Sequence, residues 1–128
     1  MKVDLKLPER EELKAIEIIS IGHDSSYHGI IRSKSDETIK VISELSLIDR
    51  IYNFIDKGMG VWKRTGEWLN QEPKHAVRFE GNSETVMMLW FGQNQISILT
   101  RPITPKNPVI IFNSGKQSVT ELRKMFGL

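Results

Sequence analysis

The sequence of 128 residues contains no cysteine, and this absence excludes several kinds of site at once. A chain without thiols forms no disulfide, no zinc–thiolate centre and no cysteine nucleophile. Long hydrophobic runs are also missing, because the longest, Val86 to Phe91, is far shorter than the roughly 20 apolar residues of a transmembrane helix. The N-terminus lacks the apolar stretch of a signal peptide. We therefore expect a cytoplasmic protein from the sequence as it stands, or an extracytoplasmic one if a signal segment was removed.

Excess charge is scarce as well, since the formal net charge is only +2, but the charge is unevenly distributed. Residues 1–56 carry 8 basic and 11 acidic side chains, whereas residues 57–128 carry 10 basic and 5 acidic ones. A nucleic-acid-binding protein usually has a denser basic stripe than this. The asymmetry therefore favours an acidic partner for the second half of the chain, with a nucleic acid as the weaker alternative.

Six stretches have the residue pattern of β-strands. Residues 14–21 and 27–32 flank turn residues and predict an N-terminal hairpin. Four more predict a meander in the second half: residues 76–80, 85–91, 95–100 and 109–112. Within it, Val86 to Phe91 is apolar at every position, which predicts a strand covered on both faces.

A long amphipathic helix is predicted between these two groups of strands. Ser35 is a suitable N-cap, with Asp36 and Glu37 in the first turn. Apolar residues then recur at three- and four-residue spacing, at Ile39, Ile42, Leu45, Ile48, Ile51, Tyr52 and Ile55. Ser46 and Leu47 interrupt this pattern, so two helices with a bend are an alternative, and Gly58 and Gly60 end the segment.

A short helix is predicted at the C-terminus, where Ser118 and Glu121 have the spacing of a capping box. Residues 1–12 are charged and contain Pro8, which predicts a loosely held lead-in. Together the elements predict one α+β domain over residues 1–128. We expect an antiparallel sheet of about four to six strands, with the long helix and the short C-terminal helix packed on one face.

His23, Asp24 and His28 are the only clustered residues of the types that bind metals. Their spacing does not match a zinc-enzyme helix, which places both histidines on one face. A polar turn explains them better, so a small hydrolase or metal enzyme is the least favoured alternative. The sequence predicts no metal and no cofactor.

Gly115 and Lys116 precede the C-terminal helix and resemble the end of a phosphate-binding loop. The full motif requires a glycine five residues before Gly115, and that position is Ile110. What remains predicts a weak anion site at a helix N-terminus, with a plain capping turn as the simpler interpretation.

The irregular segment from Gly58 to Pro73 contains Trp62, Lys63, Arg64 and Trp68. Long irregular loops are often functional, and tryptophan and arginine dominate binding hot spots. The segment therefore predicts a partner-binding loop. The alternative is that one or both indoles cover the open end of the core, because tryptophan is highly buried on average. Trp90 lies inside a predicted central strand, which predicts a packing role.

Three stretches carry a resemblance to known domains: Leu7-Pro8 with residues 12–18, Ser35-Asp36-Glu37, and Val77-Arg78-Phe79. In these the chain resembles small uncharacterised α+β domains of bacterial exported or lipid-anchored proteins. The resemblance implies a binding or accessory role and no catalytic residues.

These observations predict a non-enzymatic module that binds another protein, as inhibitors and immunity proteins do. The alternative from another class is a nucleic-acid-associated protein that uses the basic C-terminal half. We expect a monomer or a homodimer, since an uncovered strand edge can pair with a second copy.

Overall fold

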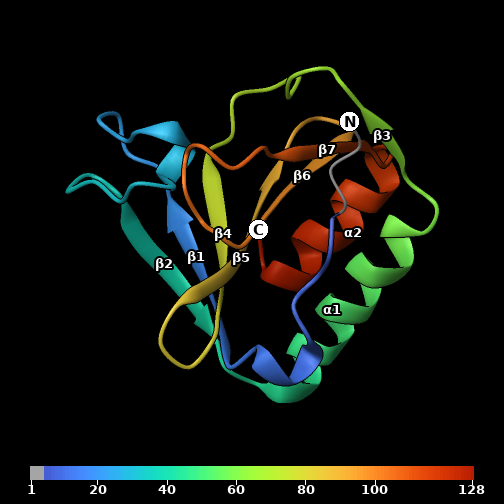
Figure 1. The fold of residues 1–128 in the computed structure, drawn as a ribbon, viewed down its shortest axis with the longest axis horizontal. Helices are drawn as coiled ribbons and strands as arrows, with labels where there is room; N and C mark the ends of the chain where they lie inside the picture. Colours follow the sequence, from blue (N-terminus) through green and yellow to red (C-terminus); the bar gives the residue numbers. More distant parts are fainter. Residues whose placement is uncertain (1–4) are drawn as a thin grey trace.

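The structure, a computed structural model, describes residues 5–128 and is built on one antiparallel sheet. Seven strands pair in the order β2-β1-β4-β5-β6-β7-β3, and every pair is antiparallel. Figure 1 shows the sheet with β2 at one side and β3 at the other. The strands are β1 Ala15–Ser20, β2 Glu37–Ile42, β3 Lys63–Thr65, β4 His75–Glu80, β5 Thr85–Phe91, β6 Gln95–Thr100 and β7 Ile110–Asn113. The α+β class and the antiparallel sheet are confirmed, although the predicted four to six strands were too few.

Two α-helices pack on the same face of this sheet (Figure 1). They are α1, Leu45–Met59, and α2, Lys116–Phe126. Ile48, Ile51 and Ile55 of α1 share one buried cluster with Phe126 of α2 and with residues of β1, β4, β5 and β6. Each such side chain contributes about 1.5–3 kcal/mol when it is fully buried.

Loops rather than helices cover the opposite face. A second buried cluster there contains Ile19, Ala76, Met88, Trp90 and Leu99, with partly buried residues of three loops packed against it. In β5, Met87 and Leu89 point to the helical face, whereas Met88 and Trp90 point to the loop face. The prediction that this strand is covered on both faces is confirmed, and Trp90 is a packing residue with 3% of its surface exposed.

The predicted helix start at Ser35 is wrong, because residues 37–42 form strand β2. β2 pairs with β1, so that Ile16 lies opposite Ile42 and Ile18 opposite Lys40. Thr38, Ile39, Val41 and Ile42 are β-branched, and such residues favour strands over helices. The helix begins instead at Leu45, close to the break in the apolar pattern at Ser46 and Leu47.

The predicted second strand over residues 27–32 is also wrong. Residues Tyr27–Gly29 form a 3₁₀ turn, η2, and Ser26 and Ile31 make only an isolated bridge. Tyr27, His28 and Gly29 all have positive φ values, of 52°, 54° and 89°, which a strand cannot accommodate. The partner of β1 on this side is therefore β2.

Three further details differ from the sequence prediction. Ser118 lies inside α2, and the N-cap is Gly115, which has a φ of 84° and offers no side-chain cap. Residues 63–65, predicted to be irregular, form the short edge strand β3 beside β7. Leu5 and Leu7 of the predicted loose lead-in pack against the helical-face core, and Tyr52 donates a hydrogen bond of 2.8 Å to the Pro8 carbonyl. Residues 1–4 of that lead-in lie outside the described part of the chain.

Candidate functional site

The two tryptophans of the predicted binding loop, Trp62 and Trp68, have different surroundings. The ring of Trp62 lies between Phe54 of α1 and Phe112 of β7, with centroid distances of 6.2 and 6.0 Å. Trp62 is half-buried and belongs to the rim of the helical-face core. Trp68, in contrast, has 89% of its surface exposed. The alternative that an indole covers the core therefore holds for Trp62, and Trp68 alone is available to a partner.

The two basic residues of the loop lie in β3, at one edge of the sheet. Arg64 is opposite Phe112 and Lys63 is opposite Asn113. Neighbouring residues of a strand point to opposite faces, so these two side chains do not form a single basic patch. Val61, just before this strand, is also exposed. The structure thus brings none of Lys63, Arg64 and Trp68 into a shared pocket.

The other edge of the sheet, formed by β2, carries exposed apolar side chains within the strand itself. Among residues 5–128, seven large hydrophobic side chains are exposed; two of them, Ile39 and Val41, lie in β2, and Leu45 follows this strand at the start of α1. β2 is a terminal strand, so the backbone groups along its outer side have no strand partner among residues 5–128. We call this surface, β2 with the side chains of Ile39 and Val41, the β2 edge.

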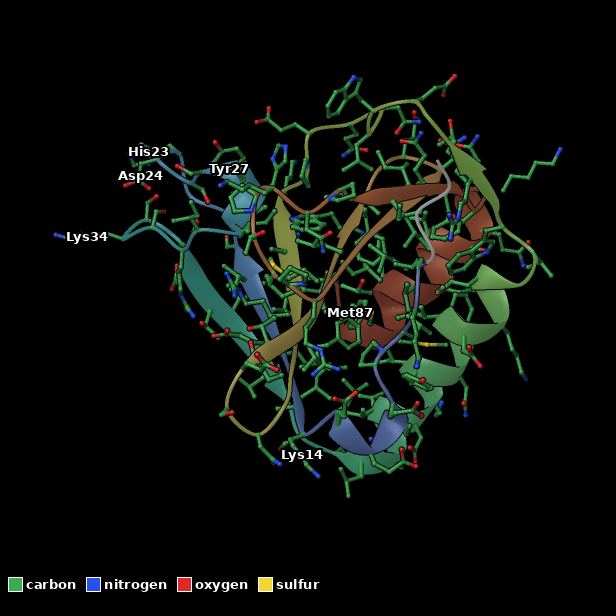
Figure 2. All side chains as sticks on the ribbon, viewed as in Figure 1. Lys14, His23, Asp24, Tyr27, Lys34 and Met87 are labelled. Atoms are coloured by element: carbon green, nitrogen blue, oxygen red, sulfur yellow. The ribbon has the colours of Figure 1, made fainter. Side chains whose placement is uncertain are left out.

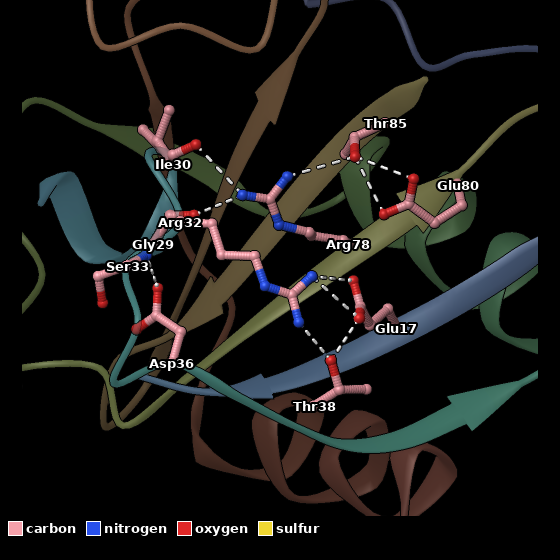
Figure 3. A network of polar contacts seen from close by, with 10 residues as sticks. All are labelled: Glu17, Gly29, Ile30, Arg32, Ser33, Asp36, Thr38, Arg78, Glu80 and Thr85. Atoms are coloured by element: carbon pink, nitrogen blue, oxygen red, sulfur yellow. Dashed lines mark hydrogen bonds and ion pairs between the residues drawn. The ribbon is translucent and has the colours of Figure 1, made fainter. Parts of the chain in front are cut away.

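A network of polar side chains on the loop face links β2 to β1 and to the 21–36 loop (Figure 3). Glu17 of β1 accepts hydrogen bonds from Arg32, at 3.2 Å, and from Thr38 of β2. Arg32 also donates to Thr38 at 2.5 Å. Asp36 accepts hydrogen bonds from the backbone N–H groups of Gly22 and Ser33, which joins the two ends of the 21–36 loop.

Arg78 of β4 ties the same loop to the middle of the sheet. Its Nη2 donates to the carbonyl oxygens of Gly29, at 2.6 Å, and Ile30, at 3.2 Å, and its Nη1 donates to Thr85 at 3.3 Å (Figure 3). Burial lowers the pKa of Arg78, an effect that Glu80 and Glu17 oppose. The Nε1 of Trp90 donates to the His28 carbonyl at 2.9 Å. These bonds tie the positive-φ turn to β4 and β5 on the loop face of the sheet.

His23, Asp24 and His28 do not converge on a common point. Figure 2 shows His23 and Asp24 at the outer tip of the 21–36 loop, away from the body of the domain. Asp24 accepts a hydrogen bond from Ser35, as a turn residue does. Within residues 5–128 there is no group of three or more histidine, aspartate or glutamate side chains that could hold a metal ion.

Gly115 and Lys116 lie where the sequence places them, at the start of α2. The space around Gly115 is open, with no atom near the position of a side chain. Lys116 lines a cleft together with Arg123 of the same helix and with Lys74 and His75 at the start of β4. Sequence reasoning missed this grouping because only the fold brings the start of β4 beside α2.

Sequence reasoning also missed the β2 edge, because residues 37–42 were interpreted as the first turns of a helix. The run of β-branched residues at Thr38, Ile39, Val41 and Ile42 was the signal that could have revealed it.

The structure contains no helix among residues 5–128 that is long and apolar enough to cross a membrane.

No protein-family model, curated protein or solved structure matches the chain. The resemblance to bacterial exported domains therefore stays a prediction, and the function is argued from the geometry of this chain alone.

Proposed function

We propose that the protein is a non-enzymatic module that binds another protein along the β2 edge. The observation that carries this proposal is that β2, a terminal strand of the sheet, exposes two large apolar side chains, Ile39 and Val41. Exposed apolar patches of this kind are typical of interaction sites. The role is that of an inhibitor or immunity-type partner, in keeping with the sequence prediction.

An extended segment of the partner is the occupant that fits this edge best. A terminal strand offers free backbone N–H and C=O groups, to which an extended peptide adds as a further strand. β2 has six residues, a usual length for such pairing. Ile39 and Val41, which are 47% and 59% exposed, give the segment apolar contacts beside the backbone bonds. We therefore expect the partner segment to be extended and rich in apolar side chains.

The opposite edge is less suited to strand addition. β3 has three residues and carries Lys63 and Arg64, and short, charged edge strands resist pairing. The β2 and β3 edges are separated by five intervening strands, which corresponds to roughly 30 Å at about 4.8 Å per strand. Trp68, which has 89% of its surface exposed, is therefore proposed as a second contact, independent of the β2 edge.

Affinity capture with matched variants tests this function. The immobilised wild-type chain, I39T/V41T and W68A are each exposed to lysate of the source organism. Threonine keeps the β-propensity of the strand but removes apolar contact area. A partner that binds through the β2 edge is retained by the wild type and W68A and lost by I39T/V41T. Loss with W68A alone would move the binding site to the β3 edge, and equal retention by all three would refute both surfaces.

A further inference from the structure

A cleft of about 290 Å³ opens where α2 passes the start of β4 and the turn between β5 and β6. Its charged lining consists of Lys74, His75, Lys116 and Arg123. Phe91 and Val119 supply apolar walls, and Gln71 and Gln93 supply amide groups. The cleft lies on the helical face of the sheet, apart from the β2 edge, and an inference about it is independent of the proposed function.

The basic side chains of this cleft have no acidic neighbour in its lining, because no carboxylate of residues 5–128 lines it. The four ion pairs found among residues 5–128 involve Arg10, Arg32 and Arg101, and none involves a basic residue of the cleft. Three permanent cations that share one hollow repel one another and favour an anion between them.

The fold fixes the directions of these groups. Lys116, Val119 and Arg123 are spaced by three and four residues, which places them on one face of α2. The guanidinium carbon of Arg123 lies 5.5 Å from the ring centroid of Phe91, so the buried ring holds this side chain by a cation–π contact. His75, the first residue of β4, is half-buried and faces them from the sheet.

We propose that this cleft binds the phosphate group of a phosphorylated small molecule. Three cations and an imidazole suit a phosphomonoester, which carries a charge of about −1.5 to −2, better than a carboxylate with a single charge. Arginine and lysine are the usual phosphate partners in proteins. The volume is at the lower end of the roughly 300–1,000 Å³ range of small-molecule sites, which matches a metabolite-sized ligand.

Titration calorimetry with sodium pyrophosphate tests this proposal, using two double variants of equal charge. In K74Q/K116Q both changes lie in the cleft, and in K106Q/K124Q both lie outside it; all four lysines are exposed, so the fold is preserved in both. We expect saturable binding of pyrophosphate to the wild type. Its affinity should be at least about tenfold weaker in K74Q/K116Q, because that variant loses charge-assisted hydrogen bonds to the anion. In K106Q/K124Q, which keeps those bonds, the affinity should change by less than about twofold.

Three results would overturn the proposal. The first is the absence of saturable pyrophosphate binding to the wild type. The second is an equal loss of affinity in both double variants, which would show that only net charge matters. The third comes from a second titration with a single-stranded oligonucleotide. If the oligonucleotide binds, loses affinity in K74Q/K116Q and weakens steeply with salt while pyrophosphate does not bind, the cleft is a nucleic-acid backbone site instead.

Discussion

The indole of Trp62 occupies the space above Gly58, so that a Cβ atom at position 58 would overlap with its six-membered ring. Gly58 belongs to the last turn of α1, and the main-chain N–H groups of Val61 and Trp62 both donate to its carbonyl oxygen, at 2.9 and 2.7 Å. The chain thus turns tightly after the helix and places the first indole of the predicted binding loop against the core. This relationship separates the roles of the two loop tryptophans.

Substitution of the two tryptophans should therefore have unequal effects on stability. We expect W62A to lower the free energy of unfolding by about 2–4 kcal/mol, because it removes the contacts with Phe54 and Phe112 and leaves a cavity. W68A should change it by less than about 0.5 kcal/mol, as is usual for exposed positions. Urea unfolding of both variants measures the difference. A large loss in W68A would show that the outer indole is structural.

Removal of the Arg78 side chain should release the 21–36 loop. R78M keeps the aliphatic volume but leaves the carbonyl oxygens of Gly29 and Ile30 without their guanidinium donor. Since a buried unsatisfied polar group costs about 1–3 kcal/mol, we expect a loss of at least that size. Hydrogen exchange should become faster throughout residues 21–36 and remain slow in β5 and β6. R32M, which changes an exposed arginine of the same network, is the matched control. Uniform destabilisation without local opening would contradict this role.

Asp36 should contribute to stability only above the acid range. Burial alone would raise the pKa of Asp36, but hydrogen bonds from the backbone of Gly22 and Ser33 and from the Ser25 and Ser33 side chains outweigh it and lower the pKa. A carboxyl group with a lowered folded-state pKa stabilises the fold above its unfolded pKa, and this stabilisation is lost as the pH falls through the folded value. We expect D36N to be less stable than the wild type at neutral pH and the difference to shrink below about pH 4. A stability difference between D36N and the wild type that stays constant with pH would show that the charge of the carboxylate is not its cause.

Anion binding in the basic cleft should become tighter as the pH falls. Burial lowers the pKa of His75, and Arg123 and Lys74 lower it further, so the free protein holds this imidazole neutral at pH 7. A bound dianion favours the protonated form and raises that pKa, and binding is therefore linked to proton uptake. The remaining basic side chain in the lining is that of Lys116. Sulfate, which keeps its charge between pH 5 and 8, is the suitable probe. The affinity of the wild type for sulfate should rise toward pH 5, whereas that of H75Q should stay nearly constant. An equal pH dependence in both proteins would show that protonation of His75 is not its cause.

The second half of the fold could be predicted from the sequence because local signals and tertiary context agree there. Alternation in residues 76–80 and 95–100, with turn residues between, leaves one consistent arrangement of neighbouring strands. The continuous apolar run of β5 predicted a strand that is covered by buried side chains on both of its faces. Local pattern was sufficient because each of these strands pairs with its neighbour in sequence.

The first half could not be predicted in the same way, because its patterns are ambiguous. Ile39, Ile42 and Leu45 fit helical spacing, although they span a strand, a turn and the start of a helix. The pairing of β1 with both β2 and β4 is non-local and leaves no mark on the local sequence. The same limitation hid the basic cleft, in which Lys74 and Lys116 are neighbours only in the folded chain.

The central claim, that a partner segment adds to β2 as a further strand, is tested most directly by hydrogen exchange of the β2 amides with and without the captured partner. We expect the outward-facing amides of residues 37–42 to exchange quickly in the free protein and to become strongly protected in the complex, while the amides of β3 do not change. Protection at residues 63–68 with no change in β2 would contradict the claim and place the docking surface at the opposite edge of the sheet.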